Sequence, residues 1–144
     1  MSKIVIGLLG LGEVGSVVAE ALLSRGHRVK AWDINFARPG SRASVNLASH
    51  PKLESVEAAS QLASGCTVLI SMVTAGNAKD AARSIIAGVD VETFYLDLNS
   101  VSPECKYEMA AMMASCGARF VEAAIMAPIH PKGMDAPVLL GGAW

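Results

Sequence analysis

A glycine-rich segment at residues 10–15 separates two stretches of opposite character. Lys3–Leu9 before it has the composition of a fully buried strand, and Glu13–Arg25 after it has the pattern of a helix. Gly26 then provides the residue type favoured where a helix ends in a left-handed turn. A strand, a tight turn and a helix in this order begin a βαβ unit, so the chain is expected to build a parallel sheet.

The same alternation of apolar runs and helical stretches continues along the chain, which predicts an α/β protein. Further strands are expected at His27–Asp33, Leu53–Val56, Cys66–Val73, Phe94–Leu98, Arg119–Ile125 and Ala136–Leu140. Helices are expected at Glu57–Ala63 and Ala78–Ala87, and a short helix is expected within Asn35–Pro51. A further helix is expected to begin after the capping residue Ser102, with Pro103 in its first turn, and to end at Gly117. We predict a Rossmann-type, doubly wound and mostly parallel sheet with helices on both faces, and residues 1–144 as one domain.

Charge and hydropathy narrow the classes of partner. The chain has 12 basic and 13 acidic side chains, whereas nucleic acid binding needs clustered Lys and Arg, so no nucleic acid partner is expected. Residues 58–78 form the longest uncharged stretch, but its polar side chains argue against a membrane span. Without a convincing secretory signal, the protein is expected to be cytoplasmic. Its 52% hydrophobic content predicts contact with another domain or a second copy of the chain.

Cysteine and histidine give no sign of a metal centre. The three cysteines, Cys66, Cys105 and Cys116, form no C-x-x-C pair, and we expect them to be small buried apolar side chains. The three histidines have no metal-ligand spacing to one another or to cysteine, so no metal is predicted.

The glycine-rich segment has the G-x-G-x-x-G spacing of a dinucleotide-binding turn. Gly10 permits the tight turn, Gly12 lets the backbone approach a pyrophosphate, and Gly15 allows close packing of helix on strand. The helix N-terminus adds free N–H groups and a positive dipole. The alternative is a glycine turn that serves packing alone.

Asp33 lies at the end of the second predicted strand, about 20 residues after the motif, where an acidic side chain binds an adenosine ribose. Its charge would repel a 2′-phosphate and favours NAD over NADP. Arg38 and Arg42 in the next loop could neutralise that phosphate, or be ordinary exposed charges. A methyltransferase also has an acid here, but the third glycine suits a dinucleotide better.

Several segments resemble the β-hydroxyacid dehydrogenases, which include 3-hydroxyisobutyrate and 6-phosphogluconate dehydrogenases. The resemblance rests on residues 7–15, on 22–29 with Trp32 and Asp33, on 70–74, and on 97–103, which is similar to the family's D-x-S-T-x-S-P segment. It implies a nicotinamide cofactor, NAD or NADP, and a small-molecule substrate. The implied cofactor contacts are Gly10, Leu11, Gly12, Glu13, Val14, Gly15, Asp33, Arg38, Val73, Thr74 and Asn99.

On the substrate side the resemblance is incomplete. Asn99, next to Ser100, replaces a serine that contacts substrate in better-known members, and Met126, Ala127 and Pro128 stand where they have Ser-Gly-Gly. These five residues are the substrate-side candidates, in the pattern of a poorly characterised branch. Alternatively, Asn99 only bridges backbone groups at a strand end.

The family's catalytic lysine, in a G-x-x-x-K-x-x-N pattern of a C-terminal helical domain, has no counterpart in this sequence, and Lys132 has the character of an exposed loop residue. The catalytic residue is therefore unknown, and that helical domain is expected to be absent from the 144 residues. Two functions remain: the nucleotide domain of an oxidoreductase acting on a hydroxy acid or related carbonyl compound, or a non-catalytic NAD(H)-binding or redox-sensing module that works with a partner chain.

Overall fold

The computed structural model describes residues 4–142, which form one sheet in the order β3-β2-β1-β4-β5-β6-β7. All neighbouring strands are parallel except β6 and β7, which are antiparallel. The strands are β1 (Val5–Leu9), β2 (Arg28–Trp32), β3 (Glu54–Ser55), β4 (Val68–Ser71), β5 (Phe94–Asp97), β6 (Arg119–Ile125) and β7 (Val138–Gly141). The α/β class and the mostly parallel, doubly wound sheet are therefore confirmed.

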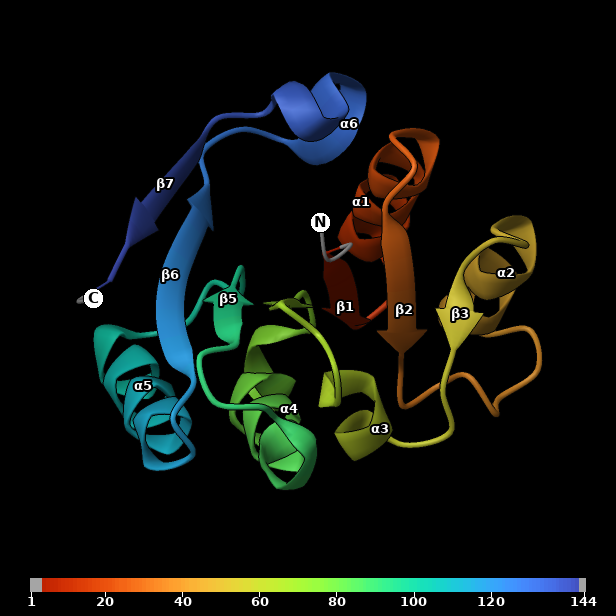
Figure 1. The fold of residues 1–144 in the computed structure, drawn as a ribbon. Helices are drawn as coiled ribbons and strands as arrows, with labels where there is room; N and C mark the ends of the chain where they lie inside the picture. The colour runs from red at the N-terminus through yellow and green to blue at the C-terminus, as the bar shows by residue number, and fades with distance from the viewer. Residues whose placement is uncertain (1–3, 143–144) are drawn as a thin grey trace.

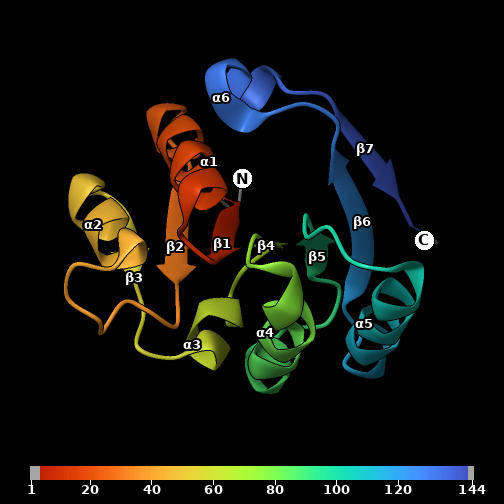
Figure 2. The ribbon, with the colours of Figure 1, turned by 180° about the vertical axis from the view of Figure 1, so that it is seen from behind.

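The helices lie on both faces of this sheet, as Figures 1 and 2 show from opposite sides. They are α1 (Glu13–Ser24), α2 (Arg42–Ser49), α3 (Ala59–Ala63), α4 (Ala78–Ile85), α5 (Pro103–Ser115) and α6 (Ile129–Lys132), with 3₁₀ turns η1 (Ala75–Asn77), η2 (Ile86–Gly88) and η3 (Gly133–Asp135). α3, α4 and α5 cover one face, and α1 and α2 cover the opposite face over β1 and β2. The crossovers between parallel strands put the helices there.

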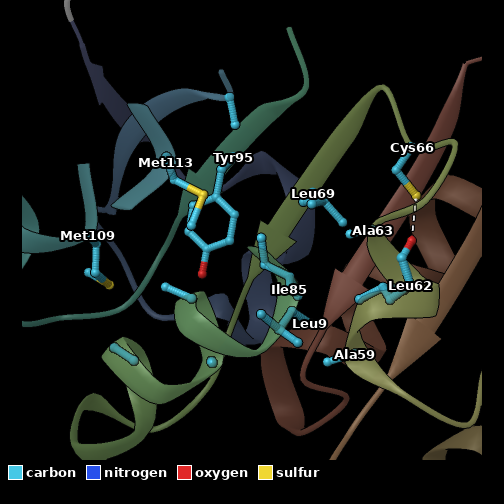
Figure 3. Close-up of a cluster of buried hydrophobic side chains, with 14 residues drawn as sticks. Leu9, Ala59, Leu62, Ala63, Cys66, Leu69, Ile85, Tyr95, Met109 and Met113 are labelled. Carbon is cyan, nitrogen blue, oxygen red and sulfur yellow. Dashed lines mark hydrogen bonds between the residues drawn. The ribbon is translucent and has the colours of Figure 1, made fainter. Parts of the chain in front are cut away.

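The core under α3, α4 and α5 is built around Tyr95 of β5 (Figure 3). The Tyr95 ring is fully buried and packs beside Met109 and Met113 of α5, and burial raises the pKa of its phenol. Cys66 is also buried, and its Sγ donates a hydrogen bond to the Leu62 carbonyl at 3.0 Å. Burial raises the pKa of this thiol as well, so Cys66 behaves as the small apolar residue that was expected.

Helix ends follow the predicted signals. The Ser102 side chain accepts a hydrogen bond from the Cys105 N–H and so caps α5, with Pro103 in the first turn. Gly26 and Gly117 adopt φ of +81° and +79° just beyond α1 and α5. Segment 127–135, which lies between the predicted strands Arg119–Ile125 and Ala136–Leu140, contains α6 and η3.

One half of the sheet keeps an exposed apolar surface. On the face of α1 and α2, apolar side chains of β4 to β7 line a groove of about 150 Å³, together with Val18 of α1 and with Ile129 and Met134 from the segment between β6 and β7. At the sheet edge, Val138 and Leu140 of β7 line this groove and are 45% and 64% exposed. The apolar excess of the sequence is therefore partly located on this surface, which we call the β7 face. None of the described helices has the length and apolarity needed to cross a bilayer.

Candidate functional site

A cavity of about 790 Å³ opens at the carboxyl ends of β1, β2, β4 and β5. From β1 the chain turns into α1 on one face of the sheet, whereas from β4 it turns into α4 on the other. The divergence leaves a crevice between the two turns, which is where open α/β sheets bind ligands. The cavity is the candidate site.

The glycine turn forms one wall of this cavity, and the space around the Cα atom differs at each of its three glycines. Gly10 adopts φ of +99°, and a Cβ there would lie 2.3 Å from the Met72 carbonyl oxygen. A Cβ on Gly15 would lie 2.5 Å from the Gly10 oxygen, so only glycine lets α1 start this close to β1. At Gly12 a Cβ would meet no atom within 4 Å, because the position faces open space. That space is where a ligand can approach the backbone.

Asp33 stands beside the glycine turn at the end of β2. Its Oδ2 accepts a hydrogen bond from the Leu11 N–H at 2.9 Å, and its Oδ1 accepts one from the Asn35 N–H at 2.8 Å. The carboxylate also lines the cavity. Asp33 therefore fixes the glycine turn and leaves lone pairs available for a hydroxyl-bearing ligand.

The opposite wall is formed by the end of β4 and by Asn99, which follows β5. Val73 and Thr74 line the cavity as predicted. The Asn99 Oδ1 accepts a hydrogen bond from the Val73 N–H at 2.7 Å, and its Nδ2 donates one to the Ser71 Oγ at 2.9 Å. The buried Asn99 side chain thus joins the end of β4 to the end of β5, and the residue also lines the cavity beside Ser100.

A buried ion pair beneath Asn99 was missed by the sequence reasoning. The Nζ of Lys106, on α5, contacts the Asp97 carboxylate at 2.5 Å, with side-chain exposures of 9% and 0%. The Asp97 carboxylate also accepts a hydrogen bond from the Asn99 Nδ2. Lysine in a helix is usually exposed, and only the position of Lys106 on the side of α5 that also carries Met109 and Met113 could have suggested this pairing.

Not every predicted contact residue lines the cavity. The cavity lining includes nine of them: Gly10, Gly12, Glu13, Val14, Asp33, Val73, Thr74, Asn99 and Ser100. It does not include the other six, which are Leu11, Gly15, Arg38, Met126, Ala127 and Pro128. Leu11 and Gly15 are buried behind the turn. The arginine at the cavity is Arg42, which begins α2 and lies 3.7 Å from Glu13. The three-residue segment 126–128 begins one residue after Ile125, the last lining position.

These features agree with a comparison to known families. A model of the NAD-binding domain of 6-phosphogluconate dehydrogenase matches residues 5–127. The chain belongs to this family of NAD-binding domains. The domain's glycine turn, Asp33 and the β4 end all lie within the matched residues.

Individual relatives of the domain are longer than this chain. It is 26% identical over 122 residues to a mitochondrial 3-hydroxyisobutyrate dehydrogenase of Drosophila melanogaster, covering 83% of this chain and 36% of that protein. It is 29% identical over 124 residues to the cytokine-like nuclear factor N-PAC of Pongo abelii, covering 83% of this chain and 21% of that protein. The chain therefore spans a fifth to about a third of these relatives.

A solved structure of Mycobacterium tuberculosis 3-hydroxyisobutyrate dehydrogenase with L-serine shares the domain's fold, with a TM-score of 0.85 and 22% identity. The superposition covers 98% of this chain and 47% of that one. This likeness confirms the Rossmann-type fold.

The residues of the cavity fit a dinucleotide. Gly12 leaves open space at the start of α1 and supplies no side chain to cap the helix, so first-turn N–H groups are free to bind phosphate oxygens. Asp33 offers carboxylate oxygens one strand away, at the distance along the sequence typical of a ribose ligand. Among the described residues that line the cavity there is no lysine or histidine to transfer a proton.

Proposed function

We propose that this domain binds NAD(H) and forms the nucleotide half of an oxidoreductase that acts on a hydroxy acid or a related carbonyl compound. The observation that carries the proposal is the crevice between β1 and β4, lined by a glycine turn whose central residue, Gly12, faces open space. Family membership supports the cofactor, and the named dehydrogenase relatives support the reaction class.

The chain's own residues have distinct parts in this function. The start of α1 binds the pyrophosphate, Asp33 binds the adenosine ribose, and Val73 and Thr74 contact the middle of the cofactor. Asn99 holds the β4 end against β5 and so shapes the nicotinamide side. When bound, the nicotinamide accepts or donates a hydride. The substrate meets the ring near Ser100 and the 126–128 segment, and groups outside the described residues supply proton transfer.

A non-catalytic NAD(H)-binding or redox-sensing module is the second candidate function. Two observations favour it: the described cavity lining has no proton-transferring lysine or histidine, and one relative is named as a nuclear factor rather than as an enzyme. In this case the domain reports cofactor occupancy to a partner chain.

An assay of binding and turnover separates the two functions. Calorimetry with NAD and NADH should show saturable binding to the 144-residue chain under either proposal. A panel of hydroxy acids with NAD, followed at 340 nm, should show turnover for the whole protein if it is an oxidoreductase. Binding with no turnover in the whole protein supports the non-catalytic module. If calorimetry shows no heat even at about millimolar NAD, binding is weaker than roughly −4 kcal/mol, and this result contradicts both proposed functions.

Between the two cofactors, we propose that the domain prefers NAD. The Asp33 carboxylate lines the ribose end of the cavity and repels a 2′-phosphate, while Arg42, the arginine that lines this end, lies beside the carboxylate of Glu13. Asp33→Asn keeps an oxygen for the Leu11 N–H, loses the acceptor for the Asn35 N–H and removes the charge. We expect it to weaken NAD binding about tenfold and to narrow the preference over NADP.

Asp33→Ala is the companion variant, because it also removes the bond to the glycine turn. Both variants are titrated with NAD and NADP by calorimetry. If either variant loses NAD and NADP affinity equally while the wild type prefers NAD, Asp33 acts on the turn alone and the ribose contact is misplaced.

In the whole protein, we propose that the β7 face is covered by a further domain or by a second copy of the chain. Its apolar groove and the exposed Val138 and Leu140 that line it support this proposal. Light scattering on the chain, whose mass is 14.9 kDa, distinguishes self-association from a need for further sequence.

The free thiols of Cys66, Cys105 and Cys116 support a reducing compartment, and we propose a cytoplasmic location.

A further inference from the structure

Helix α2 touches the glycine turn through one side chain that the motif does not include. The Nδ2 of Asn46 donates hydrogen bonds to the carbonyl oxygens of Leu11 and Gly12, at 2.9 and 3.1 Å. Asn46 is half-buried and does not line the cavity, so a cofactor in the cavity would not touch it. Figures 1 and 2 place α2 next to α1 on this side of the sheet.

These two bonds help to set the direction of the N–H groups that face the cavity. The Gly12 carbonyl also accepts the Ser16 N–H at 3.0 Å, whereas for the Leu11 carbonyl Asn46 is the donor found among the described residues. In a trans peptide the C=O and the N–H point in opposite directions. Holding the Leu11 and Gly12 carbonyls toward Asn46 therefore turns the N–H groups of Gly12 and Glu13 away from it. Gly12 and Glu13 line the cavity, so their N–H groups are directed toward that side.

Other contacts fix the same turn without replacing this one. Asp33 binds the N–H of Leu11, which sets the preceding peptide. Beyond Asn46, the Nε2 of buried His50 lies 2.9 Å from the Ser16 Oγ and ties the end of α2 to α1. Asn46 is thus the side chain of α2 that acts directly on the two peptides between the turn and the helix.

We propose that Asn46 is a positioning residue for dinucleotide binding, which preorganises the Gly12 and Glu13 N–H groups for the pyrophosphate. The inference rests on the proposed binding of NAD(H). The preorganised turn binds phosphate without the free-energy cost of reorienting two peptides. This advantage applies only to ligands that carry phosphate. A ligand made of base and ribose alone gains nothing from it.

Asn46→Leu tests the proposal, because leucine has a similar size and no N–H donor. The 144-residue chain and its variant are titrated with NAD by calorimetry and with adenosine, which has no phosphate, by NMR shifts. We expect NAD affinity to fall about tenfold and adenosine affinity to stay within about twofold. Leu47→Ala is the matched control: it loosens the packing of the same helix and should leave the ratio of the two affinities unchanged.

Asn46→Ala, which removes the donors without adding a charge, is the second variant, and its melting is followed by circular dichroism beside that of Asn46→Leu. A selective loss of NAD affinity in a folded variant supports the positioning role. The proposal is overturned if a folded variant loses affinity for NAD and adenosine equally, or loses neither affinity. It is also overturned if both variants unfold, because Asn46 would then serve general stability. If the wild type binds adenosine and not NAD, the proposed function itself fails.

Discussion

Replacing Lys106 by methionine is expected to lower the free energy of unfolding by about 3–5 kcal/mol. The Asp97 side chain is completely buried, and its Oδ2 lies 2.5 Å from the Lys106 Nζ. Methionine fills similar space but leaves the carboxylate without a counter-charge in an environment that water cannot reach. An uncompensated buried charge is far more costly than the net stabilisation that the intact pair provides. Urea denaturation followed by circular dichroism measures the change.

The double variant Asp97→Asn/Lys106→Met is the control for this prediction. It removes both charges and keeps a polar side chain that can accept the hydrogen bond from Asn99. We expect it to recover at least about half of the lost stability, because a neutral amide is less costly to bury than a carboxylate. If the free energy of unfolding of the single variant Lys106→Met lies within about 1 kcal/mol of the wild-type value, water reaches the Asp97 carboxylate.

Replacing Gly12 by valine is expected to reduce NAD affinity at least about a hundredfold, or roughly 2.7 kcal/mol, with little loss of stability. A Cβ at this position meets no protein atom within 4 Å, so the fold accepts the side chain. Gly12 has φ of −80° and ψ of −149°, so it does not lie in the left-handed region that favours glycine. The valine methyl groups would then occupy the space in which the pyrophosphate approaches α1. Calorimetry with NAD and thermal melting measure the two effects.

Two further glycine variants distinguish blockage from damage to the fold. Gly15→Val places a Cβ 2.5 Å from the Gly10 oxygen and should lose stability together with binding. Gly141→Val lies in β7, outside the cavity lining and with no atom within 4 Å of its Cβ, and should change neither. NAD binding by Gly12→Val at wild-type affinity would show that the pyrophosphate does not lie over this turn.

Local signals predicted most of the fold. The run from β1 through the glycine turn to α1 is encoded within about 20 neighbouring residues, and so are the Ser102 cap and the left-handed Gly26 and Gly117. Each depends on the steric or hydrogen-bonding properties of one residue in its own segment. Strand ends were less certain: β3 is only Glu54–Ser55, because pairing with β2 decides where it stops.

The motif and Asp33 were predicted from their spacing after strands, whereas Val73, Thr74 and Asn99 were implied by the family resemblance; the structure brings all of these segments to one cavity. The sequence did not show that Arg42, rather than Arg38, lies at the cavity, or that segment 126–128 lies just past the lining. Both depend on the path of a loop between elements. Loop paths are fixed by contacts distant in the sequence, which periodicity does not record.

By itself, the sequence determined the α/β class, the glycine turn and the acidic residue that follows β2, because each follows from residue type and spacing along one segment. Only the tertiary structure decided that Asp97 and Lys106 form a buried pair, that Asn99 joins two strands, and that Asn46 holds the glycine turn. These contacts join side chains from different elements. Hydrogen bonds and ion pairs of this kind depend on distances that exist only once the sheet and its helices are packed.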